Sequence, residues 1–528
     1  MTQNPPEACG DPVDDDDPRY RALQAHDVRF DGWFFVAVTS TGIYCRPSCP
    51  SVVPRRSHVR FYPTAAAAQR AGFRACKRCR PDTAPGSPEW NRRGDVVGRA
   101  MRSIADGVVD RAGVAGLADR LGYSPRQLHR LLLAEVGAGP LGLARAQRAE
   151  AARILLETTD LPAAAVAFAA GFGSVRQFND TVRAVFAEPP TALRARARRA
   201  GRRPIGSSSP DRPGSSSTVT PGVPAPVSLR LAYRSPFPAA SLFAFLAARA
   251  VPGVEEGDAS YHRRALALTH GTAVATVSDD GAGALHCVLH VEDLRDLTLA
   301  ARRLRHLFDL DADPAAVADV LRPDPLLAPA LDAAPGLRIP GAVDGDELLV
   351  RAVLGQQVSV AGARTLAGRL AATAGRPLPF SVGTVTRTFP SASALAAVAP
   401  ADLPLPGARA GALLHLCRLL AEGDLVLDPG ADRDAVQHRL LQIPGVGPWT
   451  AAYVRMRALA DPDAFPASDL GLRRALRRLD LPATATAATR LAERWRPYRA
   501  YALQYLWAGL AGHRAPTPVP HPKERATA

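Results

Sequence analysis

Lysine is nearly missing from this chain, and cysteines are scarce for its length. Of the 65 basic residues, only Lys77 and Lys523 are lysines, so nearly all the positive charge is arginine. Seven cysteines in 528 residues are too few for a secreted scaffold built on disulfides. The longest uncharged, largely apolar stretch, 161–175, is too short to span a bilayer, and the N-terminus has no basic segment followed by an apolar one. These absences favour a soluble, cytoplasmic protein and exclude a membrane protein.

The overall composition is that of a globular protein with several domains. Hydrophobic residues make up 47% and charged residues 22%, and 528 residues allow about three or four domains. The net charge of +15 favours a polyanionic partner such as nucleic acid. The preference for arginine over lysine, together with much Ala, Gly and Pro, also fits a bias in coding composition. Charge alone is therefore weak evidence for DNA binding.

Four of the cysteines form two close pairs, Cys45 with Cys49 and Cys76 with Cys79. Short pairs of this kind place two thiolates on one side of a tetrahedral ion, and a second pair completes the site, so we expect Zn²⁺. A purely structural zinc site is the favoured alternative for a bare pattern of four cysteines. The other three cysteines, Cys9, Cys287 and Cys417, match no metal-binding spacing and are expected to be inert.

The residues around these cysteines carry a specific resemblance. The stretches TGIYCRPSC and GFRACKRC resemble the N-terminal domain of the bacterial adaptive-response protein Ada over about 65 residues. The resemblance implies that Cys45 accepts a methyl group from a DNA methyl phosphotriester. A zinc-bound thiol is deprotonated, so a nucleophile exists at neutral pH without a general base. Candidates to approach the DNA backbone, each of which could equally be a solvated surface group, are Thr41, Arg46, Arg55 and Arg56.

Residues 95–200 have a helical pattern in which one motif occurs twice. Gly122 makes a turn and Ser124 caps the helix that follows; about 50 residues later Ser174 caps a helix expected over 175–186. Two such motifs in tandem resemble the AraC-type transcription-factor domain, which implies contacts with promoter DNA and with RNA polymerase. We expect a core face of Leu128, Leu131, Phe178 and Val182, and a face towards the major groove of Arg126, Gln127, Arg176 and Asn179.

Near the C-terminus, the segment LQIPGVGPWTAAYV predicts two helices joined by a tight hairpin. Gly445 and Gly447 let backbone N–H groups approach a DNA phosphate. With FPASD ending at Asp469, this segment resembles the helix-hairpin-helix glycosylases, specifically bacterial 3-methyladenine DNA glycosylase II, over about 228–512. By motif position Asp469 is the catalytic carboxylate, which would stabilise the positive charge that develops on the sugar. An isolated Asp before a helix is more often only a cap.

The same resemblance implies the other parts of this site. An aromatic pocket for a flipped cationic base is formed by Trp449, Tyr453 and Trp507, with Gln356 helping to line it. Gln357 stands where a relative places an apolar wedge that fills the vacated stack. The family's hairpin often holds a monovalent cation through backbone carbonyls.

Two further absences narrow the chemistry. Trp449 stands where some relatives carry a Schiff-base lysine, which predicts a monofunctional glycosylase. No Pro-Cys-His-Arg motif occurs, so direct repair of O-alkylated guanine is not expected. The alternative function is a transcriptional regulator of the adaptive response whose glycosylase half only binds damaged DNA.

The expected fold is therefore multidomain and mainly α, with α+β parts. In chain order we expect a small zinc domain at 19–85 and an all-α tandem helix-turn-helix domain at 95–200, followed by a flexible linker rich in Gly, Ser and Pro at 201–227. A small antiparallel α+β domain at 228–310 and an all-α helix-hairpin-helix glycosylase domain at 311–512 complete the chain. The partner is double-stranded DNA, no membrane is involved, and the location is the bacterial nucleoid.

Overall fold

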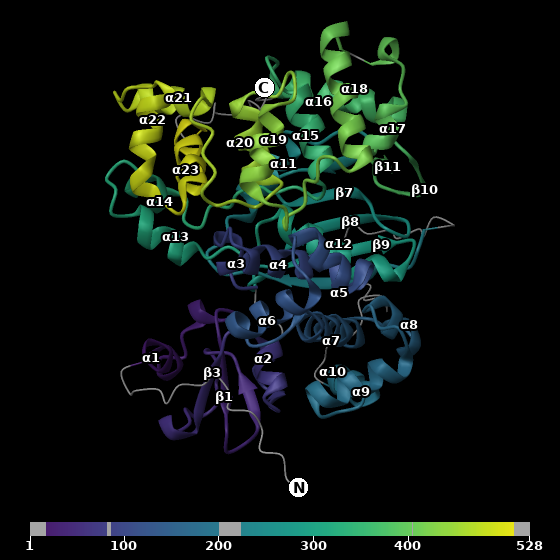
Figure 1. Ribbon diagram of the computed structural model, residues 1–528, viewed down its shortest axis with the longest axis vertical. Coiled ribbons are helices and arrows are strands. Elements are labelled where there is room, and N and C mark those ends of the chain that lie inside the picture. Colours follow the sequence, from purple (N-terminus) through teal and green to yellow (C-terminus); the bar gives the residue numbers. More distant parts are fainter. Residues whose placement is uncertain (1–16, 82–85, 200–222, 404, 512–528) are drawn as a thin grey trace, which may run out of the picture.

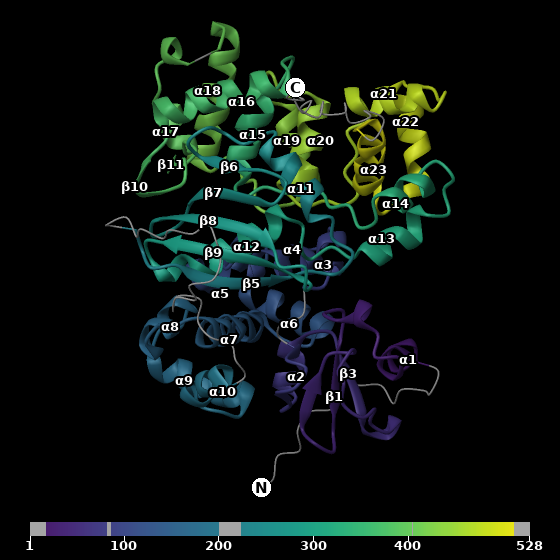
Figure 2. The same ribbon diagram turned by 180° about the vertical axis from the view of Figure 1, so that it is seen from behind.

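The computed structural model describes residues 17–81, 86–199, 223–403 and 405–511, which form three stacked layers (Figures 1 and 2). The cysteine-rich unit and most of the helix-turn-helix unit form one end, a β-sheet lies in the middle with residues 89–105 beside it, and a helical domain forms the other end. Most of the predicted linker, 201–222, lies outside the described residues, as does Cys9.

The cysteine-rich unit is built on a four-stranded sheet in the order β3-β1-β2-β4. Its elements are α1 (Pro18–Gln24), β1 (Phe35–Val38), β2 (Ile43–Cys45), β3 (Val59–Tyr62), α2 (Ala65–Arg70) and β4 (Arg74–Ala75). Strands β2 and β4 are parallel, and their register pairs Tyr44 with Ala75. This pairing brings the ends of the two strands together, so that Cys45 and Cys76, which follow the paired residues, become neighbours.

The helix-turn-helix unit is entirely helical, as predicted. Its helices are α3 (Glu89–Arg92), α4 (Val96–Ala105), α5 (Val108–Leu121), α6 (Pro125–Val136), α7 (Pro140–Thr158), α8 (Ala163–Ala169), α9 (Val175–Phe186) and α10 (Pro190–Arg199). The Ser124 and Ser174 side chains cap α6 and α9. Leu128 is buried as expected, but the prediction for Leu131 is wrong: it is only half-buried, and Leu132 fills the core in its place. Leu132, four residues after Leu128, lies on the same face of the helix.

The middle layer is an antiparallel sheet in the order β5-β9-β8-β7-β6. Its strands are β5 (Val227–Ala232), β6 (Glu255–Gly257), β7 (Tyr261–Ala267), β8 (Thr272–Asp279) and β9 (Ala284–Val291), accompanied by α11 (Ala239–Ala247) and α12 (Leu297–Leu307). The antiparallel arrangement expected from alternating apolar and polar residues is confirmed. Strand β5 begins at Val227, the last residue assigned to the linker.

The third layer is a helical domain with one short hairpin. Its helices are α13 (Pro314–Leu321), α14 (Ala328–Ala333), α15 (Gly345–Leu354), α16 (Val360–Ala374), α17 (Ala392–Ala396), α18 (Gly407–Glu422), α19 (Arg433–Leu441), α20 (Pro448–Arg457), α21 (Leu470–Arg478), α22 (Ala485–Ala492) and α23 (Arg499–Ala511). The expectation of a wholly helical domain missed β10 (Pro377–Val382) and β11 (Val385–Arg387). This hairpin forms because Phe380 and Val385 bury themselves against Ala265 and Val274 of the sheet.

The two halves of the chain share one continuous interface. One apolar cluster joins Leu155 of α7 to Leu229 of β5, and α7 packs directly on that strand. The buried guanidinium of Arg234 donates hydrogen bonds to the carbonyl oxygens of Asp31, at 2.7 Å, and Gly86, at 2.9 Å. Among the described helices, none combines the length and the apolar character needed to cross a membrane.

Candidate zinc centre and glycosylase site

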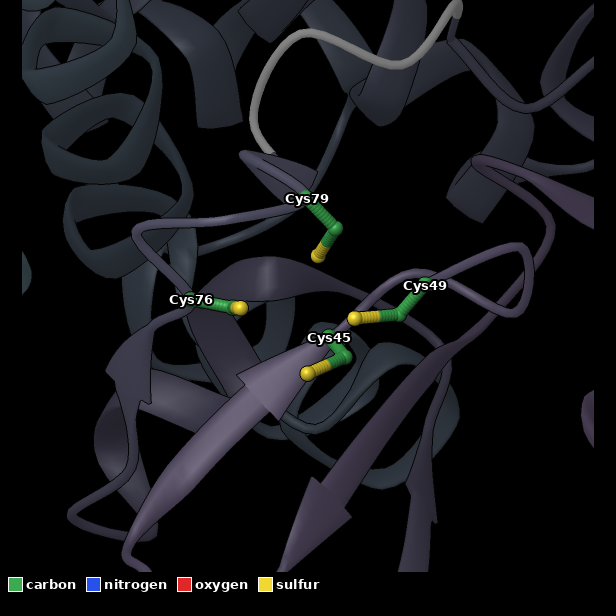
Figure 3. A group of neighbouring side chains, drawn as sticks. All are labelled: Cys45, Cys49, Cys76 and Cys79. Carbon is green, nitrogen blue, oxygen red and sulfur yellow. The ribbon is translucent and has the colours of Figure 1, made fainter. Parts of the chain in front are cut away.

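The four predicted zinc ligands converge in one buried cluster (Figure 3). Their Sγ atoms all lie within 4.8 Å of one another, although the two pairs are separated by 26 residues of sequence. Cys45 ends β2, Cys49 follows the next turn, and Cys76 and Cys79 follow β4. Four convergent thiols are the donor set that tetrahedral Zn²⁺ prefers, so the residues fit the ion.

The pKa of the Cys45 thiol also favours a metal ion at this site. Hydrogen bonding with the neighbouring sulfurs of Cys49, Cys76 and Cys79 raises the pKa of the Cys45 thiol far above its usual range, because these contacts favour its protonated form. A divalent cation at the centre reverses this penalty by stabilising the thiolate forms together. By contrast, Cys287 and Cys417 are buried singly, and burial raises the pKa of Cys417 to about 12, which agrees with the expectation that they are inert.

A buried aspartate that the sequence did not single out holds the loop between Cys45 and Cys49. Asp31 accepts hydrogen bonds from the Ser48 backbone N–H at 3.1 Å and from its hydroxyl at 2.7 Å. Arg46, predicted to approach DNA, forms an ion pair with Asp31 at 3.3 Å. Burial raises the pKa of Asp31, and no sequence motif marks this residue.

The other residues predicted to approach DNA from this unit lie on its surface. Thr41 and Arg55 are exposed. The guanidinium of Arg56 lies over the aromatic rings of Tyr20, at 5.2 Å, and Phe61, at 5.8 Å. Arg56 therefore has an intramolecular role in the structure, whereas Thr41 and Arg55 are accessible.

The residues predicted to face the major groove occupy different environments. Arg126 and Arg176 are exposed, and Arg176 lies 4.0 Å from Asp180. Asn179 is half-buried. Gln127 forms a capping box with Ser124: its side-chain oxygen accepts hydrogen bonds from the Ser124 N–H, at 3.1 Å, and from the Ser124 hydroxyl, at 2.8 Å.

At the opposite end of the molecule, Asp469 receives hydrogen bonds from three N–H groups. It is the N-cap of α21, and its Oδ1 accepts from the Leu472 N–H at 2.7 Å. The indole of Trp449 donates to Oδ2 at 2.9 Å, and the indole of Trp507 donates to Oδ1 at 2.9 Å. Asp469 is thus a helix cap and also a carboxylate held in one orientation by two side chains predicted for the pocket. Its own exposure is 8%.

The hairpin lies directly beside this carboxylate. Gly445 is exposed and has φ +84°, a conformation that favours glycine, and Gly447 is the N-cap of α20. Gln356 donates to the Gly445 carbonyl at 2.9 Å and to the Thr450 hydroxyl at 3.0 Å. Gln357 is exposed at φ +60° at the adjoining turn.

The aromatic residues form a stack next to Asp469. The rings of Trp449 and Tyr453 are 5.0 Å apart and inclined by 17°. The Tyr453 hydroxyl accepts a hydrogen bond from Arg457. Sequence reasoning missed Gly471, where an added Cβ would lie 2.8 Å from the Trp507 indole nitrogen and 3.0 Å from Asp469 Oδ1. Its place two residues after Asp469 is the only sequence signal for it.

Three family models match this chain in separate regions. They are the metal binding domain of Ada over residues 18–82, a helix-turn-helix domain over 117–196 and the AlkA N-terminal domain over 228–344. The first match, together with the cluster of four thiols, confirms the prediction of Zn²⁺ as the cofactor.

One relative matches nearly the whole chain. A Mycobacterium tuberculosis protein named "Probable bifunctional transcriptional activator/DNA repair enzyme AlkA" is 54% identical over 497 residues, which are 94% of this chain and 97% of the relative. This chain belongs to that family. The predicted resemblance to Ada, AraC-type and AlkA domains is therefore confirmed.

Two further relatives each match part of the chain. DNA-3-methyladenine glycosylase 2 of Escherichia coli is 36% identical over 52% of this chain and 95% of its own length. The regulatory protein ada of Salmonella typhimurium is 40% identical over 30% of this chain and 43% of its own length.

Proposed function

We propose that this chain is a DNA alkylation repair protein that joins a monofunctional DNA-3-methyladenine glycosylase II to a zinc-cysteine acceptor of methyl phosphotriesters and an AraC-type regulator. The observation that carries the glycosylase assignment is Asp469, fixed by the indole N–H groups of Trp449 and Trp507 at 2.9 Å each. A carboxylate used only as a cap needs no such additional donors. The membership of the AlkA-type family supports the same assignment.

In the glycosylase reaction, the target nucleotide leaves the base stack and its base enters the site beside Trp449 and Tyr453. An N-alkylated purine carries positive charge, which the electron-rich ring faces favour over a normal base. As the glycosidic bond breaks, its electron pair leaves with the base and positive charge develops on the sugar. Asp469 stabilises this charge and orients the water that adds to C1′ and releases a proton.

In the methyl-acceptor reaction, the Cys45 sulfur attacks the methyl carbon of the phosphotriester. A new S–C bond forms, the C–O bond breaks, and the phosphate leaves as an ordinary diester. Zinc held by Cys45, Cys49, Cys76 and Cys79 would keep the attacking sulfur in its thiolate form. Each chain reacts once, because nothing in this step removes the methyl group from Cys45.

The regulatory activity rests on the two helix-turn-helix motifs and on the family's activator name. We propose that Arg126, Arg176 and Asn179 contact promoter DNA, that RNA polymerase is a further partner, and that the protein is associated with the nucleoid. We also propose that its functional units follow the boundaries 19–85, 95–200, 228–310 and 311–512, with the linker between the second and third of them. We propose that Gln357, exposed beside the hairpin, contacts the DNA.

Base-release chromatography on alkylated duplex, with wild type and Asp469→Asn, tests the glycosylase. Loss of 3-methyladenine release in the variant supports hydrolysis at Asp469; undiminished release would favour the alternative, in which the back half only binds damaged DNA. Cleavage of the strand without alkali or heat would contradict a monofunctional enzyme. Mass spectrometry after exposure to methylated DNA tests Cys45, since absence of an added methyl there would make the zinc site purely structural.

A further inference from the structure

The two proposed DNA-binding surfaces lie at opposite ends of the molecule. In both views, α9 is at one end, α21 is at the other, and the strands β5 to β9 lie between them (Figures 1 and 2). This separation has consequences for how many DNA segments one chain can hold.

The glycosylase surface faces away from the sheet. At the C-terminal end of α20, Arg457 donates to the Gly341 carbonyl at 3.1 Å and its own carbonyl accepts from His306 of α12 at 2.9 Å. The hairpin is at the other end of this ten-residue helix, about 15 Å further out. Helix α23 also has its inner end near the sheet layer: Tyr501 contacts Asp309, which follows α12, and Trp507 lies nearly two turns further out.

The outer end of this half is also rich in unburied positive charge. Helix α21, whose N-cap is Asp469, buries Leu472, Ala475 and Leu476, so its arginines are directed outward. Four of them, all exposed, follow the catalytic carboxylate within nine residues: Arg473, Arg474, Arg477 and Arg478. A duplex whose flipped nucleotide reaches Asp469 passes over this surface, where arginines neutralise phosphates.

The helix-turn-helix surface of α9 faces the opposite way. Helix α7 packs on β5 of the sheet, and α9 packs on α7 through a buried face that includes Phe178 and Val182. The other face of α9 carries Arg176 and Arg183, both exposed. Recognition residues on α9 therefore face away from the sheet and from the glycosylase half.

The interface between the halves fixes this arrangement. Besides the buried Arg234 contacts, Arg99 pairs with Asp432 at 3.3 Å, Arg120 pairs with Asp428, and Arg302 donates to Gln147 at 2.9 Å. Double-stranded DNA has a persistence length of about 150 base pairs, so a short duplex behaves as a stiff rod. One short duplex cannot lie on both outer surfaces without wrapping around the sheet layer.

We propose that one chain binds two separate DNA segments at once, one at α9 and one at the hairpin and α21. The inference rests on the proposed function, because it takes both surfaces as DNA-binding. Its consequence is that DNA held by the regulator half keeps the glycosylase at high effective concentration near other segments of the same chromosome. Search for damaged bases would then extend to DNA that is close in space and distant in sequence.

A capture experiment with the full-length zinc-loaded protein tests this. A biotinylated 21-bp duplex with a tetrahydrofuran abasic analogue is immobilised to occupy the glycosylase end, protein is added, and a fluorescent undamaged 21-bp duplex is supplied at low salt. We expect about one fluorescent duplex per bound chain, with capture falling steeply as salt rises. Exclusion of the second duplex, with a stoichiometry of one duplex per chain, would overturn the inference.

Charge-reversal variants locate the second segment. Arg183→Glu on α9 should lower capture by about 10-fold, because it places negative charge against phosphates. The matched control, Arg295→Glu, changes an exposed arginine of the middle layer and should keep capture within about 2-fold of wild type. Equal capture by Arg183→Glu and wild type would contradict a segment at α9. Release of 3-methyladenine is measured separately, so failure of the glycosylase and failure of double binding give different results.

Discussion

The indole N–H of Trp507 donates a 2.9 Å hydrogen bond to Oδ1 of Asp469, across 38 residues of sequence. Together with Trp449 on Oδ2, it leaves the carboxylate one orientation, in which both oxygens accept from fixed donors. Such fixed donors keep a catalytic group placed before the substrate arrives, and this lowers the cost of reorganisation during the reaction.

This relationship predicts different effects for the carboxylate and its donors. Asp469→Asn should lower kcat for 3-methyladenine release by at least about 100-fold, because the charge that stabilises the sugar is lost. Trp507→Phe keeps a ring face but loses the N–H, so kcat should fall about 10-fold while affinity for an abasic duplex stays near that of wild type. Single-turnover base release and duplex titration measure both. Trp90→Phe, in the other half of the chain, is the matched control.

Gly471 gives a steric test of the same site. In Gly471→Ala the new Cβ would lie 2.8 Å from the Trp507 indole nitrogen and 3.0 Å from Asp469 Oδ1, so one of them must move. We expect a loss of kcat of about 10-fold or more, since small displacements of positioned groups are costly. Gly411→Ala on α18, where a Cβ would meet nothing within 4 Å, should leave kcat unchanged. Equal activities for the two variants would contradict the proposed positioning.

The zinc centre predicts a defined metal content. Wild type should hold one Zn²⁺ per chain, and Cys49→Ala should lose most of it, because three thiolates no longer complete the tetrahedral site. A strong chelator should unfold the cysteine-rich unit, since binding and folding of such small sites are coupled. Elemental analysis and near-ultraviolet circular dichroism measure these effects. Cys417→Ala, a buried cysteine of the helical domain, should retain a full equivalent of zinc.

The stability of the sheet layer should depend on pH through His262. This side chain is 1% exposed, both ring nitrogens lack a hydrogen-bond partner, and burial lowers its pKa to about 4, an effect opposed by Glu255 and reinforced by Arg264 and Arg351. His262 binds a proton below about pH 6.5 in the unfolded chain but only below about pH 4 in the folded protein. The contribution of neutral His262 to the free energy of unfolding is therefore complete above pH 6.5 and declines as the pH falls from 6.5 to 4.

Between pH 6.5 and 4 the free energy of unfolding should fall by about 3 kcal/mol at most, because each pH unit between the two pKa values contributes about 1.4 kcal/mol. His262→Leu should remove this part of the pH dependence, whereas His415→Leu, at an exposed site on α18, should retain it. Urea unfolding between pH 4 and 7 measures the free energy of unfolding of both variants. An unchanged slope in His262→Leu would show that other groups cause the decline.

Replacing Arg234 tests the interface between the two halves of the chain. Its guanidinium donates to the carbonyls of Asp31, Gly86 and Asp311, so Arg234→Met should leave three acceptors without this partner, of which the Asp31 carbonyl is buried. We expect a loss of about 2–4 kcal/mol in the free energy that holds the halves together. Small-angle scattering should show a larger radius of gyration. Arg230→Met, whose side chain is 59% exposed, is the control and should leave the shape unchanged.

The sequence by itself determined the local features of this protein. The spacing of Cys45, Cys49, Cys76 and Cys79, the serine caps of α6 and α9 and the turn at Gly445 each depend on residues close together in the chain, where backbone geometry sets the outcome. The confirmed family also follows from such short motifs, because their residue types carry the chemistry directly.

Only the tertiary structure decided which distant groups meet. That Trp507 reaches Asp469, that Asp31 clamps the loop of Cys45, and that a hairpin packs against β7 depend on how helices and strands pack, and no local pattern encodes those contacts. Burial of apolar surface between the layers fixed the opposed directions of the two proposed DNA-binding surfaces, because neither half can turn without exposing that apolar surface to water.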